Sequence, residues 1–145
     1  MEFRIDPKSG DVAVATDELG KPNGLAFSPD EKTLYVADSS VTHDPLGAHE
    51  IVAVDVSPEG KLSSRRTFAV IDPGVPDGFR VDVDGNIWTS AADGVHCITP
   101  DGELIGKILV PETVTNLAFG GPKRNRLFIT AAASLYSIYV GVRGL

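Results

Sequence analysis

Short apolar runs separated by turn residues make up almost the whole chain. Runs rich in Val, Ile, Phe, Tyr and Thr are typical of β-strands, and the Pro, Gly, Asn and Asp between them are typical of turns. No segment has the apolar spacing and end caps of an amphipathic helix. The pattern therefore predicts an all-β protein. The runs that carry it are TLYVAD (33–38), EIVAVDV (50–56), GFRVDV (78–83), NIWTSA (86–91), GVHCIT (94–99) and RLFITA (126–131).

The apolar runs form an internal repeat. Residues 22–38, 76–93 and 114–133 share one plan, in which a polar residue precedes an apolar strand, a turn and a second apolar strand. Two of these repeats continue into a further pair of turn-linked strands. A four-stranded antiparallel unit that recurs every roughly 40 to 55 residues is the pattern of β-propeller blades. Within the repeat, the equivalent first residues are Asn23, Asp77 and Thr115.

The repeat starts and ends in the middle of a blade. Residues 1–20 match only an outer pair of strands, 21–72 and 73–111 each match a blade, and 112–145 match a blade without its last strand. We therefore expect one domain over 1–145 that supplies about three blades, which is fewer than the 4–8 blades of a closed ring. Such an arc exposes apolar inter-blade faces and unpaired edges, which favour association.

Composition narrows the classes of partner. The 145 residues carry a net charge of −7, which opposes binding to nucleic acid and to anionic membranes. The single cysteine, Cys97, excludes an internal disulfide framework and a multi-cysteine zinc site, and its apolar neighbours favour a buried, unreactive thiol. No signal-peptide pattern or bilayer-length apolar run is present, so we expect a cytoplasmic protein.

The motifs KPNGLAFSPDEKTLYVADS, VPDGFRVDVDGNIWTSAADGVHCITPDGELIGKI and TNLAFGGPKRNRLFITAAASLY resemble the C-terminal half of the gluconolactonase/regucalcin (senescence marker protein) family. The resemblance implies a six-bladed β-propeller that holds a divalent metal at its centre and hydrolyses sugar lactones or related esters. Calcium or zinc is the implied metal, with magnesium or manganese as alternatives. The resemblance also implies that Asn23 and Asp77 are metal ligands, and it implies a third ligand, a Glu, that has no counterpart in this chain.

The residue types suit that chemistry. An amide oxygen and a carboxylate are ligands that a hard cation prefers, and Gly24 and Gly78 allow a close approach of the backbone. The metal would polarise the lactone carbonyl, and Asp77, or a water that it orients, would act as general base. On spacing alone, "NG" and "DG" are also ordinary turn formers.

Other polar residues receive weaker assignments. Thr115 and Asn116 lie at the equivalent position of the third repeat, where we expect them to line the wall of the site, with substrate contact as the alternative. Asp38, Asp82 and Asp93 follow strand residues and are expected to bind turns and backbone. The three histidines, His43, His49 and His96, are not spaced as a zinc site.

Two functional hypotheses follow. The first is a metal-dependent lactonase in which a homodimer of two half-propellers supplies the ring. The second is a non-catalytic, truncated half-propeller that only binds metal or a partner.

Overall fold

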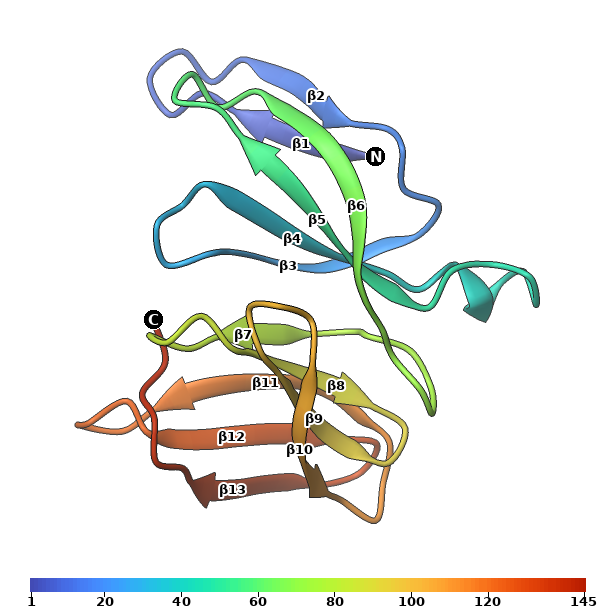
Figure 1. The fold of residues 1–145 in the computed structure, drawn as a ribbon, viewed down its shortest axis with the longest axis vertical. Helices are drawn as coiled ribbons and strands as arrows, with labels where there is room; N and C mark the ends of the chain where they lie inside the picture. The colour runs from blue at the N-terminus through green and yellow to red at the C-terminus, as the bar shows by residue number, and fades with distance from the viewer.

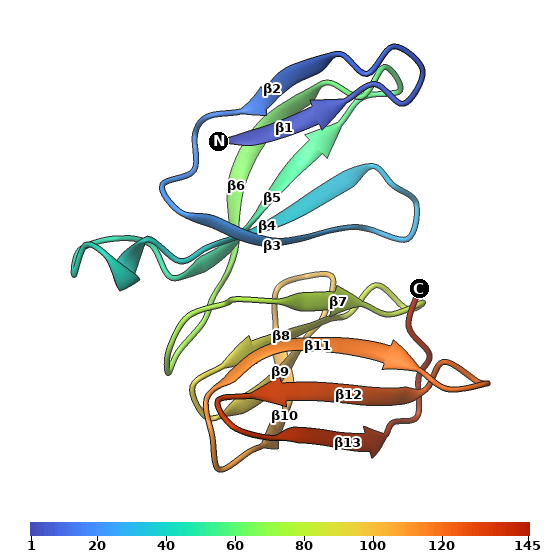
Figure 2. The same ribbon diagram turned by 180° about the vertical axis from the view of Figure 1, so that it is seen from behind.

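A computed structural model describes all 145 residues. Its regular secondary structure consists almost only of β-strands, joined by turns and loops (Figures 1 and 2). One short 3-10 turn, η1 (Ser40–Thr42), connects β4 to β5. No helix in the structure has the length and apolar character needed to cross a membrane. The strands are β1 (Glu2–Ile5), β2 (Val12–Thr16), β3 (Pro22–Phe27), β4 (Thr33–Asp38), β5 (Glu50–Val56), β6 (Leu62–Val70), β7 (Phe79–Val81), β8 (Ile87–Ala91), β9 (Gly94–Ile98), β10 (Leu104–Leu109), β11 (Val114–Gly120), β12 (Arg126–Ala131) and β13 (Leu135–Tyr139).

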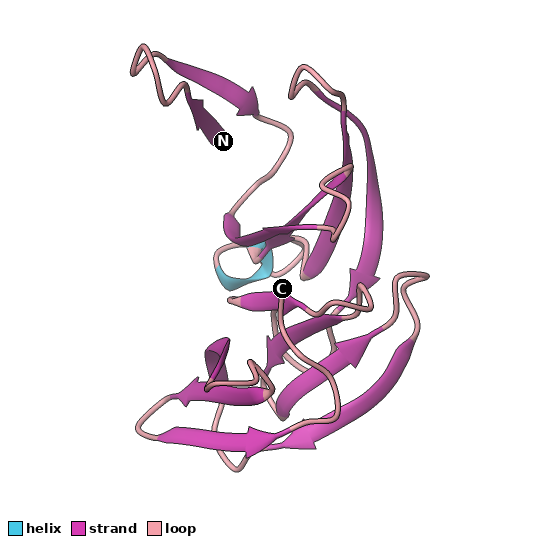
Figure 3. Ribbon diagram, turned by 90° about the vertical axis from the view of Figure 1, so that its left-hand side faces the viewer, coloured by secondary structure: helices cyan, strands magenta, loops and turns pink.

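The strands pair in chain order into four antiparallel sheets. The sheets are β1-β2, β3-β4-β5-β6, β7-β8-β9-β10 and β11-β12-β13. Two therefore have the four strands of a complete propeller blade. The sheets follow one another along an open arc, with the β1-β2 hairpin at one end and β13 at the other (Figure 3). The prediction of an all-β partial propeller is confirmed.

Apolar side chains fill the spaces between neighbouring sheets. One core lies between the second and third sheets and includes Tyr35, Ile51, Phe79 and Ile87. Another lies between the third and fourth sheets and includes Leu127. Because successive side chains of a strand point to opposite faces, strands of an inner sheet must be apolar on both faces. This explains why residues 34–37 are continuously apolar and buried, and why residues 94–98 are buried throughout, with the polar His96 among them.

The two ends of the arc leave apolar side chains in solvent. In the hairpin, Phe3 is opposite Val14 and Ile5 is opposite Val12, and the exposed fractions of these side chains are 52% to 64%. At the other end, β13 has one unpaired edge. Exposed apolar faces of this kind are typical of surfaces that another chain or segment covers.

Candidate metal centre

The first strands of the blades touch through a repeated backbone hydrogen bond. The N–H of Gly24 donates to the carbonyl of Asp77 over 2.9 Å, and the N–H of Gly78 donates to the carbonyl of Thr115 over 2.9 Å. Each bond joins one blade to the next at the same position of the repeat. The structure therefore brings Asn23, Asp77 and Thr115 to equivalent places along neighbouring inner strands.

These contacts explain why glycine follows Asn23 and Asp77. A Cβ atom on Gly24 would lie 2.4 Å from the Asp77 carbonyl oxygen, and one on Gly78 would lie 2.2 Å from Oδ1 of Asn116. Both distances are shorter than any ordinary contact. At Gly24 the opposing atom is backbone, so a side chain there would push the blades apart, whereas at Gly78 the opposing atoms belong to the Asn116 side chain, which would have to move. The packing of the blades thus favours glycine at both places.

Asp77 is half-buried, and Asn23 beside it is exposed. Burial raises the pKa of the Asp77 carboxyl above its ordinary value, and hydrogen bonding from the Asn23 side chain opposes that rise. The two predicted ligands therefore lie next to each other. A cation that binds between them would relieve the burial penalty on the carboxylate.

The donor set suits a hard cation but is incomplete. Asn23 and Asp77 together offer oxygen ligands with one negative charge, whereas calcium takes 6–8 oxygens. No group of three or more His, Cys, Asp or Glu side chains in the chain is placed to hold a metal ion. The remaining ligands would have to be waters, substrate or groups from another part of the ring.

The third repeat places its polar residues differently. The Asn116 side chain lies against Gly78, and its Oδ1 accepts the N–H of Leu117 over 2.8 Å. The hydroxyl of Thr115 lies 3.2 Å from that of Thr130. Asn116 stands where the other repeats have glycine, and its exposed side chain lies over Gly78 of the neighbouring blade.

The other aspartates have structural partners. Oδ1 of Asp82 accepts the N–H groups of Asp84 and Asn86, and its Oδ2 accepts the indole N–H of Trp88 over 2.8 Å. Asp38 accepts the N–H groups of Gly20 and Lys21. These two carboxylates hold turns and links between strands.

Asp93 and the histidines are arranged in separate interactions. Asp93 forms an ion pair with Lys107 and a hydrogen bond with the buried His96, whose Nε2 lies 2.7 Å from its Oδ1. Nδ1 of His49 lies 2.8 Å from the Ile71 carbonyl oxygen, and Nδ1 of His43 lies 2.8 Å from the Thr42 hydroxyl. Each histidine thus has its own local partner.

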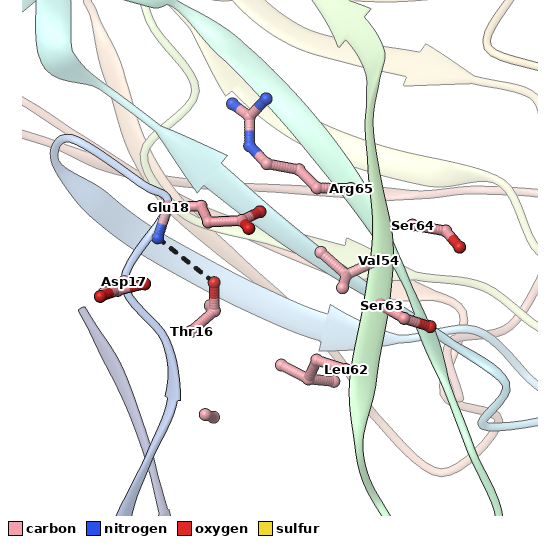
Figure 4. A pocket seen from close by; sticks show the side chains of 9 residues that line it. Thr16, Asp17, Glu18, Val54, Leu62, Ser63, Ser64 and Arg65 are labelled. Atoms are coloured by element: carbon pink, nitrogen blue, oxygen red, sulfur yellow. Dashed lines mark hydrogen bonds between the residues drawn. The ribbon is translucent and has the colours of Figure 1, made fainter.

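A pocket of about 210 Å³ lies away from the candidate centre, between the link after β2 and strand β6. Asp17, Glu18 and Arg65 line it, and the N–H of Glu18 donates to the Thr16 hydroxyl over 3.3 Å (Figure 4). Neither Asn23 nor Asp77 belongs to this pocket. The candidate centre, with Asn23 exposed and Asp77 half-buried, thus lies outside this pocket.

Two buried residues near Asp77 escaped the sequence reasoning. The Ser39 hydroxyl donates a hydrogen bond to the Pro76 carbonyl, and the Ser90 hydroxyl accepts one from the Asp77 N–H. Their only signal in the sequence is that each lies at the end of a strand, which many serines share.

Known proteins resemble this chain over nearly its whole length. Lactonohydrolase oryL of Aspergillus oryzae is 31% identical over 98% of this chain and 36% of its own length. The gluconolactonase of Zymomonas mobilis is 31% identical over 94% of this chain and 39% of its own. A solved gluconolactonase structure from Xanthomonas campestris is 38% identical, with a TM-score of 0.84 over 99% of this chain and 44% of that one.

The chain thus spans well under half the length of each of these relatives. The sequence pattern of the family described as "SMP-30/Gluconolactonase/LRE-like region" matches residues 2–133. The match covers both complete blades, the hairpin before them and most of the strands after them. The chain belongs to the SMP-30/gluconolactonase family.

Proposed function

We propose that this chain is one half of a metal-dependent hydrolase that opens sugar lactones or related esters. The observation that carries the proposal is the adjacency of Asn23 and Asp77, one amide and one half-buried carboxylate, at the starts of neighbouring inner strands. The names of the relatives, a lactonohydrolase and two gluconolactonases, support the substrate class. Because the chain covers less than half of each relative, we assign the activity to an assembled ring.

In this proposal Asn23 and Asp77 hold a divalent cation, with calcium or zinc favoured and magnesium or manganese as alternatives. The bound cation supplies Lewis-acid polarisation of the lactone carbonyl. Asn23 contributes a neutral oxygen once its amide turns that atom toward the cation. Asp77 contributes the charge, and its carbonyl, which accepts the Gly24 N–H of the preceding blade, keeps it at the inner edge.

Asp77 is also the proposed general base. Hydrolysis requires a water oxygen to bond to the carbonyl carbon, the ring C–O bond to break, and the water proton to reach the leaving ring oxygen. A carboxylate with a raised pKa accepts a proton more readily than an ordinary aspartate does. Coordination to a cation weakens that basicity, so the role requires an oxygen of Asp77 that is free of the metal. In this proposal Thr115 and Asn116 line the wall of the site and would contact substrate from the next blade.

Calorimetric titration with calcium and then with zinc tests the metal site. We expect heat of binding from the parent chain and none from Asp77→Ala, whereas Asp84→Ala, on an exposed turn, should titrate like the parent. Equal heats from the parent and Asp77→Ala would remove Asp77 from the site. Hydrolysis of gluconolactone, followed by proton release, tests the activity on whichever species binds metal.

A homodimer is the proposed source of the rest of the ring. Two copies would place two Asn23 and two Asp77 side chains around one axis. In this proposal β1 and β2 take the third and fourth places of one blade, and β13 takes the third place of another. Each junction of two copies therefore brings together two third strands, one of which must be displaced. Solution mass tests the proposal, and a folded monomer at micromolar concentration contradicts it.

The alternative is a half-propeller that binds metal or a partner without catalysis. The two-residue donor set favours it, because calcium takes 6–8 oxygens and no group of three or more His, Cys, Asp or Glu side chains in the chain is placed to hold a metal ion. The two functions differ in one measurement. Calcium binding by an assembled species that does not hydrolyse any lactone supports the alternative.

A further inference from the structure

A single peptide group, the one that joins Pro76 to Asp77, is held from both sides by serine hydroxyls. Oγ of Ser39 donates to the Pro76 carbonyl over 2.6 Å. The Asp77 N–H donates to Oγ of Ser90 over 2.8 Å. The C=O and the N–H of one planar unit therefore each have a fixed partner.

The two serines come from different blades and are both buried. Ser39 follows β4, in the second sheet, and Ser90 lies in β8, in the third sheet. Their exposed fractions are 5% and 0%. Ser39 is itself fixed, because its N–H donates to the Lys21 carbonyl and its carbonyl accepts the Thr42 hydroxyl. The clamp is thus anchored in two rigid sheets, and water has little access to it.

The clamp fixes the direction of the Asp77 side chain. A planar peptide held at both its C=O and N–H cannot rotate, so the position of the next Cα atom is set. The Asp77 carbonyl is held in turn by the Gly24 N–H. Three consecutive backbone groups around Asp77 are therefore immobilised, while the carboxylate lies beside Asn23.

Ser90 lies in the same blade as Asp77, whose carboxylate is the proposed metal ligand. The strand registers pair Leu25 with Val36, Phe79 with Thr89 and Leu117 with Ile129. The residue after each of these partners is Ala37 in the second sheet, Ser90 in the third and Thr130 in the fourth. The blade that contributes Asn23 therefore lacks a hydroxyl at this place, and its packing does not require one.

We infer that Ser39 and Ser90 are positioning residues that preorganise Asp77 for a cation. The inference rests on the proposed function, since it assigns the clamp to the same site. Residues that orient a metal ligand without touching the metal typically change metal affinity by about 10–100-fold when they are removed. The expected effect of losing either hydroxyl is therefore a loss of calcium affinity of at least about tenfold.

The test compares Ser39→Ala and Ser90→Ala with Ser28→Ala. Ser28 is also buried, and its hydroxyl donates to Asp30 and accepts the Thr33 N–H at the opposite end of strands β3 and β4 from Ser39. We expect calcium calorimetry to show weaker binding for the first two variants and parent-like binding for Ser28→Ala. Ser90→Thr, which keeps a hydroxyl as Thr130 does, should recover affinity. Parent-like affinity in both clamp variants, or equal losses in all three alanine variants, overturns the inference.

A second readout separates this inference from the proposed function. Exchange of the Asp77 amide hydrogen, measured by NMR without metal, should accelerate about tenfold or more in Ser90→Ala and stay slow in Ser28→Ala. If the parent does not bind calcium, the metal proposal fails. The clamp then stands or falls on the exchange rate alone. Unchanged exchange in Ser90→Ala means that the hydroxyl does not hold the Asp77 amide.

Discussion

Replacing Gly24 with alanine tests the contact that joins the first two complete blades. The new Cβ atom would lie 2.4 Å from the Asp77 carbonyl oxygen, 3.2 Å from the Gly78 Cα and 3.3 Å from Cδ1 of Phe79. Two of the three atoms are backbone, so no side-chain rotation relieves the clash. The inner strands must separate by about 1 Å to reach an ordinary contact distance.

That separation sets the size of the effect. A shift of about 1 Å stretches the 2.9 Å hydrogen bond from Gly24 to Asp77 beyond bonding distance. Loss of the bond costs about 1 kcal/mol, and overpacking of a tight contact costs about 1–3 kcal/mol. We therefore expect the free energy of unfolding to fall by about 2–4 kcal/mol.

Urea unfolding, followed by circular dichroism and by the fluorescence of Trp88, measures the change. With a denaturant slope of about 2 kcal/mol per molar, the midpoint should fall by about 1–2 M. Gly106→Ala is the matched control, because no atom lies within 4 Å of a Cβ built there. That variant should be as stable as the parent or slightly more stable.

A Gly24→Ala midpoint within about 0.2 M of the parent would refute the reasoning. It would mean that the blades do not touch at this position. Asp77 would then not be held beside Asn23 by the backbone, and the geometry of the candidate centre would be lost together with the packing argument.

Three further predictions concern single side chains. Because burial raises the pKa of Asp77, the stability that its protonated form contributes is lost as pH rises through that pKa. Asp77→Asn should therefore unfold at a higher urea concentration than the parent at pH 7 without calcium. The same variant should bind calcium at least about tenfold more weakly than the parent. An equal stability difference at pH 3 and pH 7 contradicts this. Burial raises the pKa of Cys97 to about 11. A thiol reagent at pH 8 should therefore label Cys97 at least about 100-fold more slowly in the folded protein than in the urea-unfolded protein. Comparable labelling rates would mean that the folded protein has an accessible thiolate. Asp82→Ala should lower the free energy of unfolding by about 2–4 kcal/mol, because it leaves the indole N–H of Trp88 and two turn N–H groups without their acceptor. A urea midpoint equal to that of the parent would show that these hydrogen bonds do not stabilise the fold.

The positions at which the strands begin were predictable because the sequence signals that set them are local. Turn residues and strand-length apolar runs set where each strand starts, and the repeat then aligned Asn23, Asp77 and Thr115. The bonds from Gly24 to Asp77 and from Gly78 to Thr115 have the same spacing in the structure. The prediction that residues 1–20 form the outer pair of strands of a blade stays a prediction; in the structure β1 and β2 form a two-stranded sheet of their own. The roles of Asn23 and Asp77 as metal ligands stay predictions.

The parts that sequence reasoning missed depend on contacts between distant segments. Ser39 reaches Pro76 across 37 residues, and nothing near Ser39 in the sequence indicates that partner. The Asn116 side chain lies against Gly78 of the neighbouring blade, and this contact exists only once the two blades pack together. Such pairings follow from how sheets stack, and a one-dimensional pattern does not contain the stacking.

The backbone bonds between inner strands have a wider consequence for how this scaffold can change. Main-chain hydrogen bonds hold the neighbouring blades together at this position, so the side chains of Asn23, Asp77 and Thr115 take no part in those bonds. Asparagine, aspartate and threonine already occupy that position within one chain. Selection can therefore exchange the chemical groups along the inner edge of the arc one at a time, while the backbone that presents them keeps its shape.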